Sequence, residues 1–63
     1  CEDIGDRFGQ ANVFLGLARS AEAQEKTSVA CAHYAIAQKL YRMLGLSDKE
    51  QECERARDRL VCQ

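Results

Sequence analysis

The chain has 63 residues, enough for one small domain, and its formal net charge is −1 with 30% of its residues charged. This balance argues against a nucleic-acid-binding protein, which is normally strongly basic, and no apolar run approaches the ~20 residues that a membrane-spanning helix needs. Proline is absent, alanine is abundant and only four residues are aromatic, so the composition favours helices over strands.

The first predicted helix covers about residues 6–20 and starts at Asp6, a good N-cap residue. Gly9 and Gly16 lie inside it, where glycine costs up to ~1 kcal/mol relative to alanine. An interior glycine indicates either a neighbouring backbone that passes close by or simple tolerance. The apolar residues recur at helical spacing and predict one buried face: Phe8, Ala11, Leu15 and Ala18, widened by Phe14 and Leu17.

The second predicted helix covers about residues 28–44. The polar residues 21–27 before it are read as a frayed helix end and a turn, with Thr27 or Ser28 as the next N-cap. A helix that is apolar on two sides usually lies between two neighbours, so this is the predicted middle helix. Its apolar residues occupy more than one stripe: Val29, Ala30, Ala32, Ile36, Ala37, Leu40, Tyr41 and Leu44.

The third predicted helix covers about residues 48–62. Gly45 directly follows the second helix, as expected for a left-handed residue at the helix end, with Leu46 folding back onto that helix. Ser47 and Glu50 then form a capping-box pattern. Charged residues at i,i+3 spacing cover most of the third helix, which is typical of a solvated outer helix. Its apolar stripe is narrow: Cys53, Ala56 and Leu60.

Two features of the sequence are typical of helical-hairpin repeats. Residues 6–11 align with residues 48–53, a period of 42 residues. The chain also resembles the tetratricopeptide (TPR) repeat, in which Leu-Gly on one helix precedes Ala-x3-aromatic-x2-Ala on the next. The resemblance is to the long-period TPR repeats of signalling and scaffold proteins, and it covers residues 4 to about 53. These residues carry it: Ala11, Leu15-Gly16, Ala30, Tyr34 and Ala37.

The resemblance implies an all-α fold of three helices, an antiparallel TPR-like hairpin followed by a polar closing helix. The whole chain, residues 1–63, is then one module, and the missing initiator methionine leads us to expect a fragment or a processed piece of a longer protein. In this pattern Gly16, Ala30 and Ala37 let two helices approach closely while Tyr34 fills the space beside them. The pattern departs at Arg19, where the family has an aromatic residue.

The resemblance also implies a non-catalytic protein–protein interaction module, such as a segment of a cytoplasmic scaffold or adaptor. We expect its apolar binding face to accept an amphipathic helix or an extended apolar peptide, or to be covered by a neighbouring repeat of the parent chain. Self-association through the first helix is a further possibility, because the core of so short a chain is small. The family's peptide-binding face corresponds to these positions: Gln10, Val13, Leu17, Ser20 and Ala21.

Four cysteines in a short chain fit a disulfide framework, which suggests an alternative function. Reflecting the second and third helices about the turn near residue 46 places Cys31 opposite Cys62 and leaves Cys1 to pair with Cys53. The chain would then be a secreted, disulfide-stapled helical peptide acting as an extracellular ligand. TPR proteins are mostly intracellular, which instead favours reduced thiols, so both states stay open.

No residue pattern in the sequence indicates catalysis. Cys31 and His33 lie two apart on a helix and therefore point about 200° away from each other, so they do not form a metal-binding pair. The glycines at positions 5, 9 and 16 are too widely spaced for a phosphate-binding loop. We expect no metal, no cofactor and no enzymatic activity.

Overall fold

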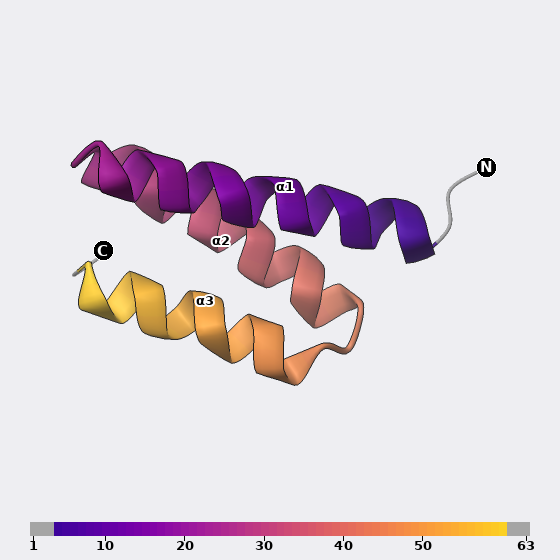
Figure 1. Ribbon diagram of the computed structural model, residues 1–63. Coiled ribbons are helices and arrows are strands. Elements are labelled where there is room, and N and C mark those ends of the chain that lie inside the picture. The colour runs from indigo at the N-terminus through magenta and orange to yellow at the C-terminus, as the bar shows by residue number, and fades with distance from the viewer. Residues whose placement is uncertain (1–3, 61–63) are drawn as a thin grey trace.

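The protein is a three-helix structure with no strand among the residues that the structure describes, 4–60. In the computed structural model the helices are α1 (Ile4–Ala23), α2 (Thr27–Met43) and α3 (Ser47–Arg59). α2 runs back along α1, and α3 runs back along α2, so that α1 and α3 point the same way (Figure 1). The predicted all-α fold is confirmed. None of the described helices is long and apolar enough to cross a membrane.

Both interhelical turns close with the same hydrogen-bond pattern. After α2 the Leu46 N–H donates to the Tyr41 carbonyl (2.9 Å) and the Gly45 N–H to the Arg42 carbonyl (3.0 Å), with Gly45 at φ +74°. This is the Schellman arrangement expected for a glycine at the end of a helix. After α1 the residue in the same left-handed conformation is Glu25, at φ +62°. A side chain is unfavourable there, so the first turn is strained where the second is not.

The helices begin differently from the prediction. α1 begins at Ile4, which places Asp6 in its first turn instead of at the N-cap. The N-cap residues of α2 and α3 are Lys26 and Leu46, and neither makes a side-chain capping hydrogen bond. The predicted caps at Thr27 or Ser28, and the capping box that starts at Ser47, are therefore wrong.

In each case the preceding Schellman turn sets where the helix starts, which shifts the hydroxyl residues one position into the helix. Asp48 and Glu50 lie in the first turn of α3, where a carboxylate is stabilised by the helix dipole.

The core lies along α2, which packs against both α1 and α3 as predicted for the middle helix. Tyr41 and Cys53 are the largest fully buried side chains, and most of the others are alanines. Small side chains let helix backbones approach closely, so the core is thin and closely packed. Its members are Ala11, Leu15, Ala18, Ala21, Ala30, Tyr34, Ala37, Tyr41, Cys53 and Ala56.

The two small-residue predictions for the helical hairpin have different outcomes. Ala30 and Ala37 are both fully buried, as the close approach of α1 and α2 requires. Gly16 is exposed, and a Cβ built on it would meet nothing within 4 Å. The prediction that Gly16 admits a neighbouring backbone is therefore wrong. Leu15 takes the core position, and the next residue on a helix lies about 100° around it.

Candidate functional site

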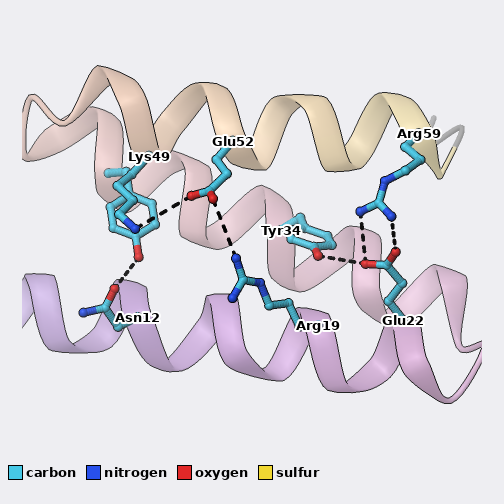
Figure 2. Close-up of polar contacts among 8 residues, drawn as sticks. Asn12, Arg19, Glu22, Tyr34, Lys49, Glu52 and Arg59 are labelled. Atoms are coloured by element: carbon cyan, nitrogen blue, oxygen red, sulfur yellow. Dashed lines mark hydrogen bonds and ion pairs between the residues drawn. The ribbon is translucent and has the colours of Figure 1, made fainter.

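A groove runs between α1 and α3, with α2 as its floor. The strong packing contacts join α2 to each neighbour, so α1 and α3 meet mainly through long side chains that reach across (Figure 2). The groove encloses about 350 Å³. Its apolar floor and charged walls are formed by Leu15, Arg19, Tyr34, Glu52, Arg55, Ala56 and Arg59.

At one end of this groove Glu22 joins all three helices. The Tyr34 hydroxyl donates to Glu22 Oε1 (2.9 Å), and Arg59 Nη1 and Nη2 donate to Oε2 and Oε1 (2.6 and 3.3 Å). The hydrogen bond from Tyr34, supported by Arg59, lowers the pKa of Glu22. Burial, and then the hydrogen bond to Glu22, raise the pKa of Tyr34. The side chain of Glu22 is 24% exposed and that of Arg59 is 61% exposed, and what distinguishes this pair is its short, two-bond geometry.

In the middle of the groove Glu52 makes two looser ion pairs. Arg19 Nη2 lies 3.7 Å from Glu52 Oε2, and Lys49 Nζ lies 3.8 Å from Oε1. The side chains of Arg19 and Glu52 are 61% and 49% exposed, so water screens the pair. Lys49 and Glu52 are three residues apart on α3, so this pair follows the i,i+3 charge spacing noted in the sequence. Arg55 also lines the groove and makes no ion pair with any described residue.

An apolar hollow of about 520 Å³ lies at the other end, between the start of α1 and the α2–α3 turn. Phe8 forms one wall and is 40% exposed. Its ring packs edge-to-face against Tyr41 (6.4 Å between centroids, 67°), whose hydroxyl donates to Asn12 Oδ1 (2.5 Å). Lys49 lines this hollow and pairs with Glu52, so the hollow adjoins the groove.

The residues predicted to bind peptide lie on a different face of α1. Gln10, Val13, Leu17 and Ser20 are exposed, but Ala21 is 6% exposed and belongs to the core, so it is not available to a ligand. Residues two apart on a helix point about 200° away from each other. Leu17 therefore faces away from the groove that Arg19 lines.

α2 carries exposed apolar residues of its own. Val29, Ile36 and Met43 recur every seven residues and so form a line along α2. At one end the two helices share a hollow of about 190 Å³, to which Gln10 and Met43 contribute. We call the following set the outer apolar face: Val13 (59% exposed), Leu17 (46%), Val29 (43%), Ile36 (40%) and Met43 (53%).

The cysteines are in two different states. Cys31 is disulfide-bonded, contrary to the reduced state that the TPR resemblance favours. Cys53 is a free, fully buried thiol, so its predicted pairing with Cys1 is not formed. Burial raises the pKa of Cys53, which keeps the thiol protonated at neutral pH. Cys1 and Cys62, the other members of the predicted pairs, lie outside the described residues.

The described residues hold no cluster of three or more histidine, cysteine, aspartate or glutamate side chains suited to a metal ion. His33 stacks on Phe14 (5.9 Å between centroids, 28°), and its Nδ1 is buried without a hydrogen-bond partner. The His33 ring on α2 therefore packs against Phe14 of α1, at the interface of the helical hairpin.

No protein-family model matches the chain, and neither the curated proteins nor the solved structures contain a match. The functional argument therefore rests on the two surfaces just described, the outer apolar face and the groove between α1 and α3.

Proposed function

We propose that the chain is a non-catalytic protein-interaction module, a TPR-like helical hairpin with a closing helix. It binds an amphipathic helix or an extended apolar peptide on the outer apolar face. The observation that carries this proposal is the concentration of large aliphatic side chains that α1 and α2 leave 40–59% exposed. An isolated exposed hydrophobic residue needs no explanation, but several large exposed hydrophobic residues on two neighbouring helices of a small domain are typical of a surface that another chain covers.

The form of this face favours a helical partner. Val13 and Leu17 lie four residues apart on α1, and Ile36 and Met43 lie seven apart on α2. Two parallel rows of aliphatic side chains present the ridges between which an amphipathic helix inserts its own. The partner is a separate protein or the next helical repeat of a longer parent chain, and both use the same contacts.

NMR titration with a synthetic leucine-rich amphipathic helical peptide tests the proposal. We expect methyl shifts concentrated at Val13, Leu17 and Ile36, and their loss in the double variant Val13→Gln with Leu17→Gln. The control is Glu54→Gln, which changes an exposed residue of α3, a helix that contributes nothing to the outer apolar face. Shifts confined to other surfaces, or none at saturating peptide, would contradict it. Sedimentation over a concentration range shows whether a second copy competes for the face.

One observation favours a second candidate function, a secreted helical ligand. Cys31 is disulfide-bonded, and such bonds persist mainly in oxidising compartments. The interaction module would work in the cytoplasm, where the bond is reduced, whereas the ligand would work outside the cell. Mass spectrometry of the protein isolated without reductant separates them. Loss of two hydrogens relative to the all-thiol form supports the secreted ligand, and the full thiol mass removes it.

A further inference from the structure

We propose that the groove between α1 and α3 binds a second partner, an acidic peptide segment, and that Glu52 occupies the position of a ligand carboxylate while the groove is empty. This site is independent of the outer apolar face, because the two surfaces lie on different sides of α1.

The charge of the groove is the first support. Three arginines line it, Arg19, Arg55 and Arg59, against two carboxylates, Glu52 in the lining and Glu22 at its end. This is a local excess of positive charge in a chain whose net charge is −1. Guanidinium groups recognise carboxylates through paired N–H donors, so an acidic peptide matches the groove in charge and in hydrogen-bonding geometry.

The two ion pairs across the groove differ in how easily a ligand can replace them. Arg59 holds Glu22 through two hydrogen bonds, the shorter of them 2.6 Å, and Tyr34 completes that carboxylate's shell. By contrast, Glu52 lies 3.7 Å from Arg19, beyond the 2.7–2.9 Å of a charge-assisted hydrogen bond. A ligand carboxylate can therefore take Arg19 from Glu52 without breaking a contact that the fold needs.

Arg55 can give the ligand a second contact, because no existing ion pair has to be broken. Arg55 lines the groove and forms no ion pair among residues 4–60. The hollow beside Phe8 adjoins the same groove through Lys49. The expected ligand thus carries carboxylates close to one apolar side chain.

Fluorescence anisotropy with a labelled peptide tests the proposal on the whole chain. The probe is a short run of glutamates flanking one phenylalanine, and the matched control peptide has glutamine in place of glutamate. We compare Glu52→Gln, Arg19→Gln and Arg55→Gln with the wild type. Glu54→Gln removes the same charge from an exposed position of α3, two residues from Glu52 and therefore about 200° away. Circular dichroism confirms that each variant is folded.

We expect Glu52→Gln to tighten binding of the acidic probe by about threefold, and Arg19→Gln and Arg55→Gln each to weaken it by about threefold, as for exposed charge pairs. Added salt should weaken binding, and Glu54→Gln should leave it near the wild-type value. Equal binding of the glutamine peptide would overturn the proposal, as would an equal gain from Glu54→Gln or no loss from Arg55→Gln. The variant Leu17→Gln should bind the acidic probe normally, so failure at one surface is distinguishable from failure at the other.

Discussion

Replacing Ala37 with leucine tests the close approach of α1 and α2. Ala37 is fully buried in the middle of α2, where the facing core residues of α1 include Ala11 and Ala18, also fully buried. None of the surface hollows described above is lined by Ala37, so three added carbon atoms have no space to enter. Overpacking of this kind costs about 1–3 kcal/mol.

That cost is a large share of the total, since a domain of this size is stable by roughly 3–9 kcal/mol. At about 4–8 °C per kcal/mol, a 2 kcal/mol loss lowers Tm by roughly 10 °C.

The assay is thermal unfolding followed by circular dichroism, with Ala32→Leu as the matched control. Ala32 lies on the same helix but is exposed, so the identical change should alter the free energy of unfolding by less than about 0.5 kcal/mol. If Ala37→Leu melts at the same temperature as the control and the wild type, α1 and α2 do not pack closely at Ala37, and the packing argument fails.

Three further predictions concern the left-handed residues of the two turns, the hydrogen bonds of Glu22 and the buried thiol of Cys53. Glu25→Gly should raise the free energy of unfolding by about 0.5–1 kcal/mol because it removes a side chain from a left-handed position, and Gly45→Ala should lower it by a similar amount. Both are measured by urea titration. The pKa of Glu22 is lowered in the folded state by Tyr34 and Arg59. Its ionised form therefore stabilises the fold fully above the unfolded value of about 4.3, and this contribution is lost as pH falls through the lower folded value. Urea titrations at neutral and acid pH should accordingly show a smaller acid-induced loss in Glu22→Gln than in the wild type, and equal losses would refute this role. Cys53 should react with iodoacetamide only after unfolding, as peptide mapping can show, and rapid labelling of the native protein would contradict its burial.

The number, order and approximate limits of the helices follow from the sequence by itself. Helical spacing of apolar residues, the absence of proline and the glycine at position 45 are local signals, and each acts through a few neighbouring residues. The position of α2 between its neighbours also follows, because its apolar residues cover more than one stripe. Of the predicted binding face, Val13 and Leu17 are exposed but Ala21 is not, since a stripe on a helix indicates an apolar surface without saying how much of it a neighbour covers.

Only the tertiary structure decides how the helices are rotated against one another. That rotation turns Gly16 to solvent and buries Ala37. It also pairs Glu22 with Arg59 across 37 positions of the chain and leaves Arg55 in the groove. Ion pairs between helices distant in sequence depend on distances of a few ångströms, and small changes in crossing angle or rotation rearrange them. The groove between α1 and α3 is therefore a property of the packed molecule, whereas the helices that form it are already specified by their local sequences.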